Sequence, residues 1–321
     1  MADVRIAVGV GDRCGDVERR PWGARPRAGD GCAHLFSPYG VAVSSRPAPP
    51  PPEPLSPLVD AHTHLDACGA VGADDVRAIV DRAAAVGVQA VVTIADDLNS
   101  VHWVTEAADW DPRVYAAVAL HPTRANALND EAKAVIERLA GLPRVVAVGE
   151  TGLDNYWPGR LEGCAEPADQ REAFAWHIDL AKRTGKPLMI HNRDADADVL
   201  DVLRAEGAPP TVIFHCFSSD AQMARTCVDA GWVLSLSGTV SFRNARALHE
   251  AARLIPPDQM LVETDAPFLT PHPYRGAPNE SYCLPYTVRA LADIVDRPAV
   301  ELARQTTATA SRVYGLPTNQ P

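Results

Sequence analysis

The sequence predicts a (β/α)8 TIM barrel preceded by a disordered, Pro-rich N-terminal extension. Three observations lead to this fold class. Eight short apolar runs occur from residue 58 onward, amphipathic helix-like stretches separate them, and the eight units fit into about 264 residues. Such alternation indicates a parallel sheet covered by helices, and the length matches a barrel of this type. An open doubly wound sheet is the alternative, but neither a GxGxxG pattern nor a P-loop pattern follows the first strand.

The first 57 residues differ from the rest of the chain. They lack a clear apolar period and end in a proline run from Pro47 to Pro57. Such a run favours extended polyproline II and disfavours packing into a core. We therefore expect a disordered extension and Pro-rich linker over residues 1–57 and a barrel domain over residues 58–321. A non-enzymatic alternative is that the extension recruits an SH3-type partner and the barrel is a platform.

The expected strands are short runs rich in Val, Ile, Leu and Ala. In chain order they cover residues 58–61, 88–95, 114–120, 145–148, 187–190, 211–214, 232–236 and 260–262. The clearest helix candidates between them cover residues 73–86, 129–140, 169–183, 195–205 and 219–230. Each helix candidate repeats apolar residues at the helical spacing, so one face of it can cover the sheet.

Composition excludes several classes of protein. With 46% hydrophobic and 22% charged residues and no apolar run of 18, the chain has the composition of a globular enzyme with no membrane span. Seven scattered cysteines without a CxxC pair indicate reduced thiols, and no secretory signal pattern is evident, so we expect a cytoplasmic location. The net charge of −11 argues against a broad electrostatic grip on a duplex. It leaves room for a nuclease whose contact is confined to a cationic metal centre.

The first expected strand ends in two imidazoles, His62 and His64. Side chains two residues apart on a strand point to the same side, so both rings can reach one point in space. Imidazole is the commonest neutral ligand for divalent transition metals. If this motif stood alone, it would be weak evidence, because two solvated loop histidines explain such a pair more often than a metal does.

Further polar residues follow the later strands, at the end of the barrel where chemistry is expected. His121 follows the third strand, Glu150 the fourth, His191 the fifth, His215 the sixth and Asp265 the eighth. Leaving His121 aside, the four histidines His62, His64, His191 and His215, with Glu150 and Asp265, come from five strand ends and suit two metal ions that share a bridging carboxylate. The remaining histidines are expected at solvated surface positions: His34, His102, His177, His249 and His272.

These segments resemble the TatD-type metal-dependent hydrolases of the amidohydrolase superfamily, known as metal-dependent deoxyribonucleases. The resemblance covers residues 58–316, with the motifs in family order. The matching segments are Asp60-Ala61-His62-Thr63-His64-Leu65-Asp66, Leu120-His121-Pro122, Gly149-Glu150-Thr151-Gly152-Leu153-Asp154, Ile190-His191-Asn192-Arg193, His215-Cys216-Phe217-Ser218, Glu263-Thr264-Asp265-Ala266-Pro267-Phe268-Leu269 and Arg275-Gly276-Ala277-Pro278-Asn279-Glu280.

The resemblance implies a binuclear site and its ligands. His62, His64 and Asp265 would hold one metal, His191 and His215 the other, and Glu150 would bridge them. Asp265 would also act as the general base toward the metal-activated water. Nitrogen and carboxylate ligands suit Zn²⁺ or Mn²⁺, whereas the family's nuclease activity implies Mg²⁺.

The resemblance also implies contacts to the substrate. His121 belongs to the family motif, and we expect it on the substrate phosphate or behind the metal ligands. Arg193, Arg275 and Asn279 are candidate phosphate contacts, since a guanidinium matches phosphate oxygens in a bidentate way. A structural loop contact is an equal alternative for these three.

The implied activity is a deoxyribonuclease that cleaves phosphodiester bonds of DNA, as an exonuclease or in single-stranded regions and at duplex ends. The alternative is a hydrolase of another ester or amide on the same scaffold, such as aminoacyl-RNA or a small metabolite, because fold alone does not fix the substrate. One departure from the family is the loop over residues 155–166, which is longer and more aromatic. It would reshape the substrate cleft or stack a nucleobase, unless it only packs as a surface loop.

Overall fold

The fold is a (β/α)8 barrel, as predicted. The computed structural model describes residues 46–317, so the expected disorder of residues 1–45 lies outside the described part. Eight strands form one sheet in the order β1 to β8, and each pairs in parallel with the next. Their bounds are β1 Leu58–Thr63, β2 Val88–Ile94, β3 Val114–Val118, β4 Val145–Asp154, β5 Leu188–Arg193, β6 Val212–Phe214, β7 Val233–Leu236 and β8 Met260–Val262.

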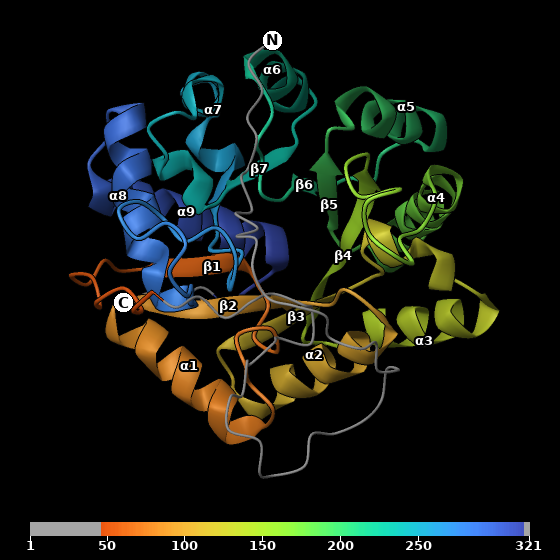
Figure 1. The fold of residues 1–321 in the computed structure, drawn as a ribbon, viewed down its shortest axis with the longest axis horizontal. Coiled ribbons are helices and arrows are strands. Elements are labelled where there is room, and N and C mark those ends of the chain that lie inside the picture. Colours follow the sequence, from red (N-terminus) through yellow and green to blue (C-terminus); the bar gives the residue numbers. More distant parts are fainter. Residues whose placement is uncertain (1–45, 318–321) are drawn as a thin grey trace, which may run out of the picture. The chain divides into compact units, whose positions relative to one another are not determined.

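Helices surround the strands (Figure 1). The α-helices are α1 Ala73–Ala85, α2 Leu98–Trp110, α3 Asp130–Ala140, α4 Pro167–Thr184, α5 Asp196–Glu206, α6 Ala221–Asp229, α7 Arg246–Ala252, α8 Leu284–Val295 and α9 Ala299–Tyr314. Short 3₁₀ turns are η1 Pro122–Ala127, η2 Gly238–Ser241, η3 Pro257–Gln259 and η4 Ser281–Cys283. In α1, for example, Val76, Ile79, Val80 and Ala83 are buried, which is the spacing of one helical face turned to the sheet.

The ring of strands closes between β1 and the segment that follows β8. The backbone N–H of His64 donates to the carbonyl of Ala266 at 2.8 Å, and the N–H of Asp265 donates to the carbonyl of His62 at 2.9 Å. Thr63 and Ala266 form a parallel bridge. The closure therefore lies at the carboxyl ends of the first and last strands and joins two of the predicted site segments.

The interior of the barrel is apolar. Every strand contributes at least one residue to a single buried cluster, which includes Val59, Ile94 and Leu261. Helix α9 adds Val313 and Tyr314 to this cluster. Because α9 also bonds to residues just before β1 and β8, through Thr307 to the Pro57 carbonyl and Thr309 to the Pro257 carbonyl, it covers the amino end of the barrel.

The part of the Pro-rich run that the structure describes packs on the barrel, and the expectation of a run that does not pack is wrong there. The carbonyls of Pro49 and Pro50 accept hydrogen bonds from the hydroxyls of Tyr282 and Tyr286, at 2.8 and 2.9 Å. Leu55 is buried in the outer core. An extended proline segment leaves its carbonyls free, so polar side chains of η4 and α8 can bind it. The division of the chain at residue 57 stays a prediction.

Candidate metal centre

The polar side chains that follow the strands meet at the carboxyl end of the barrel. The structure brings together all six residues predicted to bind metal: His62, His64, Glu150, His191, His215 and Asp265. Four overlapping groups of His, Asp and Glu have ligand atoms within 4.8 Å of one another, and these groups also include Asp96, His121 and Glu263. That these residues bind metal stays a prediction, and the geometry below gives its support.

His62 and His64 come from the end of β1, and both rings face the same point. Pairing of β1 with β2 is irregular between Asp60 and Thr63, where His62 lies. Such irregularities in a ladder re-aim side chains and are common beside active sites. The Nε2 atoms of His62 and His64 lie 3.2 Å apart, as expected for two ligands of one ion.

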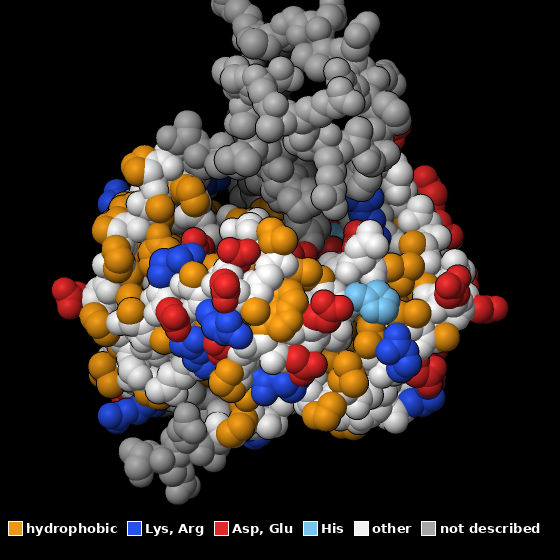
Figure 2. Space-filling model, turned by 90° about the horizontal axis from the view of Figure 1, so that it is seen from below, with side chains coloured by type: hydrophobic (Ala, Val, Ile, Leu, Met, Phe, Trp, Pro, Cys, Tyr) orange, Lys and Arg blue, Asp and Glu red, His pale blue; other side chains and the backbone are white. Residues whose placement is uncertain are grey.

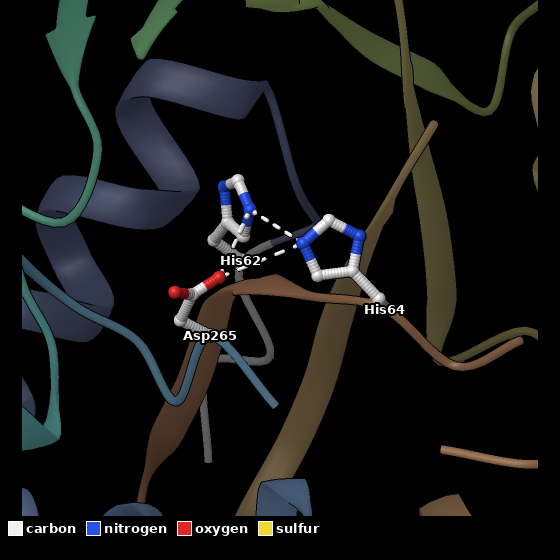
Figure 3. A group of neighbouring side chains, drawn as sticks. All are labelled: His62, His64 and Asp265. Atoms are coloured by element: carbon white, nitrogen blue, oxygen red, sulfur yellow. Dashed lines mark hydrogen bonds and ion pairs between the residues drawn. The ribbon is translucent and has the colours of Figure 1, made fainter. Parts of the chain in front are cut away.

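Asp265 completes this corner of the site, from the loop after β8 (Figure 3). Its Oδ1 lies 3.5 Å from Nε2 of His62 and 3.5 Å from Nε2 of His64. Ligand atoms roughly 3 to 3.5 Å apart fit a cation with bonds of about 2.0–2.2 Å. Asp265 has φ 52°, a left-handed conformation that few non-glycine residues adopt, and backbone strain of this kind clusters at functional sites.

Glu150 lies between two pairs of histidines and turns one oxygen to each pair. Its Oε1 is 3.5 Å from Nε2 of His62 and 3.7 Å from Nε2 of His64. Its Oε2 is 3.1 Å from Nδ1 of His191 and 2.7 Å from Nε2 of His215. A carboxylate divided in this way has the geometry of a bridging ligand between two cations.

Two glycines let β4 carry Glu150 this close to β5. A Cβ on Gly149 would collide with the Cβ of Met189, and one on Gly152 would collide with the carbonyl of His191. Gly152 also has φ 139°, which disfavours any side chain. The Gly-Glu-Thr-Gly sequence therefore places the central carboxylate where a residue with a side chain on either flank would push the strands apart.

The ring nitrogen that faces away from Glu150 is hydrogen-bonded in His62 and His191, and it faces a carboxylate at ion-pair distance in His64 and His215. Such outer partners fix the tautomer of a metal-ligating histidine and orient its ring. The pairs are His62 Nδ1 with Met189 Sδ at 3.2 Å, His64 Nδ1 with Asp96 Oδ1 at 3.7 Å, His191 Nε2 with Asp154 Oδ2 at 3.1 Å and His215 Nδ1 with Glu263 Oε1 at 3.4 Å. The donor set and its supports thus fit divalent cations.

Burial and mutual contact shift the pKa values of the cluster in both directions. Burial and the neighbouring His215 ring lower the pKa of His62 to about 4. Burial acts the same way on His64, but nearby carboxylates, Asp96 first, outweigh it and raise its pKa to about 10. Burial opposes ionisation of Glu150, yet His215 and His62 hold its pKa well below the usual range. The buried carboxylate at the middle is therefore ionised at neutral pH, which favours cation binding.

Two of the predicted substrate contacts border this cluster. His121 Nε2 lies 3.2 Å from Nδ1 of His191 and 4.0 Å from Oε2 of Glu150. Arg193 ends β5, two residues after His191, and its guanidinium lies 4.1 Å from the centre of the Tyr156 ring. Both are partly exposed, so a ligand at the centre can reach them.

The other two predicted contacts lie in the loop after β8. Arg275 is exposed, with its guanidinium 4.6 Å from the centre of the Phe242 ring. Asn279 is buried, and its amide donates to the carbonyls of Thr264 and Phe268. Both amide N–H groups of Asn279 are thus used to hold the loop that carries Asp265. The geometry favours the structural alternative for Asn279.

No role was predicted from the sequence for Asp96, Asp154 or Glu263. The available signal was their position, because Asp96 directly follows the second expected strand, while Asp154 and Glu263 lie at even spacing from Glu150 and Asp265. The expectation of a surface position for His177 is wrong. Its ring is fully buried on α4, with Nδ1 2.7 Å from the Ala173 carbonyl, and burial lowers its pKa to about 4.

On the described surface seen from below Figure 1, under α1, α2 and α3, Lys and Arg side chains alternate with Asp and Glu (Figure 2). This mixture agrees with the acidic net charge of −11. Among residues 46–317, no helix combines the length and the apolar character needed to cross a membrane.

Comparison with known proteins gives a consistent result. The family model described as TatD related DNase matches residues 59–315. The chain is 76% identical over 259 residues to the uncharacterized metal-dependent hydrolase TatD of Mycobacterium tuberculosis, which covers 81% of this chain and 98% of that protein. It is 34% identical over 210 residues to the 3'-5' ssDNA/RNA exonuclease TatD of Erwinia billingiae, covering 63% of this chain and 78% of that protein.

A similar barrel is found among solved structures. The crystal structure of YJJV, a TatD homologue from Escherichia coli K12, superposes with a TM-score of 0.74 and 26% sequence identity. The match covers 81% of this chain and 98% of that chain.

Proposed function

Because this chain belongs to the TatD-related DNase family of metal-dependent hydrolases, we propose that it is a deoxyribonuclease that holds two divalent cations and cleaves phosphodiester bonds. We propose single-stranded DNA and duplex ends as substrates and an exonuclease mode of cleavage. The name of the Erwinia billingiae relative, an ssDNA/RNA exonuclease, supports this choice of polymer. A cytoplasmic location is part of the proposal, and the five free cysteines among the described residues agree with it.

The observation that carries the proposal is the division of Glu150 between two pairs of histidines. One carboxylate oxygen lies 3.5 Å from His62, and the other lies 2.7 Å from His215. His62, His64 and Asp265 would hold one cation, and His191 and His215 the other. Two cations bound there supply positive charge for a phosphate and lower the pKa of a bound water.

The chain's own residues then have separate tasks. Asp265, buried beside His62, takes the proton that the attacking water loses. Arg193 offers a planar guanidinium to the phosphate oxygens, and His121 offers a second donor next to His191. The imidazole-rich donor set favours Zn²⁺ or Mn²⁺ over Mg²⁺, which prefers oxygen ligands.

The test is cleavage of an end-labelled single-stranded oligonucleotide, in parallel with a panel of carbonyl esters. We expect wild-type protein with Mn²⁺, Zn²⁺ or Mg²⁺ to shorten the oligonucleotide from one end. Replacement of both Glu150 and Asp265 by alanine removes this activity, because it removes the bridging carboxylate and the base.

A matched control replaces two exposed helical carboxylates, Asp201 and Glu250, by alanine. This variant loses the same two charges and is expected to cleave like wild type. Full DNA cleavage by the Glu150/Asp265 variant would overturn the mechanism. Hydrolysis of the esters without any cleavage of DNA would favour the alternative substrate class.

A further inference from the structure

The loop over residues 155–166, between β4 and α4, carries two aromatic rings beside the candidate metal centre. Tyr156 and Trp157 are partly exposed, and their ring centres lie 5.0 Å apart in an edge-to-face arrangement. The sequence alone left open whether this loop contacts a substrate or only packs on the surface. The hydrogen bonds of the loop backbone tie both of its ends to the barrel.

A single buried carboxylate ties these rings to the metal centre. Asp154 Oδ1 accepts the backbone N–H groups of Tyr156 and Trp157, at 2.8 and 2.9 Å. The other oxygen of Asp154 lies 3.1 Å from Nε2 of His191. The start of the loop is therefore fixed to a residue that faces Glu150.

The far end of the loop is fixed as well. The buried side chain of Gln170 accepts the N–H of Asp154 at 2.8 Å and donates to the carbonyl of Ala165 at 3.2 Å. Ala165 N–H in turn donates to the carbonyl of Thr123. The backbone that carries the rings is thus held in place before any ligand binds, which reduces the entropy lost on binding.

Arg193 adds a charge to the same place. On β5 it lies opposite Asp154 of β4 in the strand register. Its guanidinium lies 4.1 Å from the Tyr156 ring centre and 5.4 Å from that of Trp157. Over residues 46–317, no carboxylate forms an ion pair with Arg193. Its guanidinium lies over the two rings instead, and the Arg160 guanidinium also lies over the Tyr156 ring, at 4.7 Å. Within the same residues the Arg193 side chain makes no hydrogen bond, so its N–H groups are open to a ligand.

We propose that Tyr156, Trp157 and Arg193 form a stacking shelf for an unpaired base of a nucleic-acid strand whose phosphate lies at Glu150. The inference rests on the proposed function and names what selects the substrate. Aromatic rings and guanidinium planes stack any base face, so the shelf binds without regard to sequence. A base within a duplex is already stacked and paired, so the shelf favours single strands and frayed ends. A chain of net charge −11 gains affinity in this way without a broad basic surface.

The test is the affinity for a short single-stranded oligonucleotide, measured by fluorescence anisotropy. Phosphorothioate linkages slow cleavage during the measurement, and a gel checks that the strand is intact. The Tyr156→Ala/Trp157→Ala variant is expected to bind at least about fivefold more weakly than wild type, the loss expected for one stacked base. Thermal unfolding confirms that the variant is folded.

Two controls separate stacking from a general effect of the loop. Tyr156→Phe/Trp157→Phe keeps both rings and is expected to bind within about twofold of wild type. A strand with an abasic position at the shelf is expected to bind wild type and the alanine variant equally, since no base is left to stack. In cleavage assays the alanine variant raises KM and leaves kcat nearly unchanged.

Undiminished binding by the alanine variant would overturn the shelf, as would an equal loss for intact and abasic strands. The same assays keep this inference apart from the proposed function. If wild type cleaves DNA and the alanine variant binds as tightly as wild type, the shelf is wrong and the nuclease proposal stands. If wild type binds in a base-dependent way but cleaves with no metal, the nuclease proposal is wrong and the shelf stands.

Discussion

The two ends of the barrel use the same strands for opposite purposes. At the amino end, Val59 of β1 and Leu261 of β8 are buried in one apolar cluster. Helix α9 adds residues to this cluster and covers it. At the carboxyl end, a few residues further along the same segments, His62 and Asp265 meet in a cluster of imidazoles and carboxylates. Met189 belongs to both ends, because it packs in the interior and its sulfur contacts the ring of His62.

Along each strand, the residues that stabilise the fold thus lie only a few positions before those that can take part in chemistry. Burial of apolar side chains stabilises the interior of the amino half. The carboxyl half collects buried charges that only a cation or a set of opposite charges can balance. Substitutions at the amino end should therefore change the free energy of unfolding, and substitutions at the carboxyl end should change cleavage or metal binding.

The largest expected effect is the loss of activity on replacing the central carboxylate. Glu150→Gln keeps the size of the side chain but removes its negative charge, so both cations lose their shared ligand. We expect cleavage to fall by about a thousandfold or more, as when a key electrostatic group is removed from an active site. The free energy of unfolding, measured by chemical denaturation, is expected to change far less than for an interior substitution. Retained activity together with a large loss of stability would contradict the separation of the two ends.

The next effect is on stability, at the opposite end. Leu261→Ala removes a fully buried side chain from the barrel interior, and we expect the free energy of unfolding to fall by about 2–5 kcal/mol. Leu142→Ala, at an exposed position, is the matched control and is expected to change little. Urea denaturation measures both variants. Cleavage per folded molecule should stay within a few-fold of wild type for Leu261→Ala.

A smaller effect is expected behind the metal ligands. Glu263 lies 3.4 Å from Nδ1 of His215 and accepts the backbone N–H of Cys216. Glu263→Gln weakens the orientation of His215, so metal affinity is expected to fall roughly ten- to a hundredfold. Calorimetric titration of metal-free protein with Zn²⁺ measures it, with Asp201→Asn on the surface as the control. Equal affinity in both variants would mean that His215 needs no outer partner.

The smallest effect concerns the helix that covers the amino end. The Tyr314 hydroxyl donates to the carbonyl of Ala61 at 3.1 Å, inside the barrel. Tyr314→Phe leaves that carbonyl without its donor, and we expect a loss of about 1 kcal/mol in the free energy of unfolding. The midpoint of urea denaturation measures this, and cleavage should be unchanged. A drop in cleavage instead would show that the two ends are coupled through β1.

Much of the fold could be predicted from the sequence because its signals are local. The run over residues 260–262 matches β8 without change, and the helix expected over 73–86 is α1 at Ala73–Ala85. The fourth strand was predicted to end at residue 148, whereas β4 continues to Asp154. In the sequence, Gly149 and Gly152 indicate a loop, because glycine is disfavoured inside strands. Pairing with β5 keeps this segment extended.

The ligands could be predicted because each follows a strand, while their supports depend on contacts between strands. Asp154 meets His191 across two neighbouring strands, and Asp96 meets His64 from the loop after β2. His177 was misassigned because a helical pattern does not tell which polar residue on the buried face finds partners. The His177 ring bonds through Nδ1 to the Ala173 carbonyl, and the hydroxyl oxygen of Thr151 on β4 lies 3.1 Å from the same Nδ1.

The central claim is that Glu150 joins two cations at the carboxyl end of the barrel. The most direct measurement is electron paramagnetic resonance of metal-free protein titrated with Mn²⁺. We predict a spin-coupled spectrum that grows until about two ions are bound per chain, and its loss in the Glu150→Ala variant. A spectrum of isolated ions only, or a coupled spectrum that survives in Glu150→Ala, would contradict the claim.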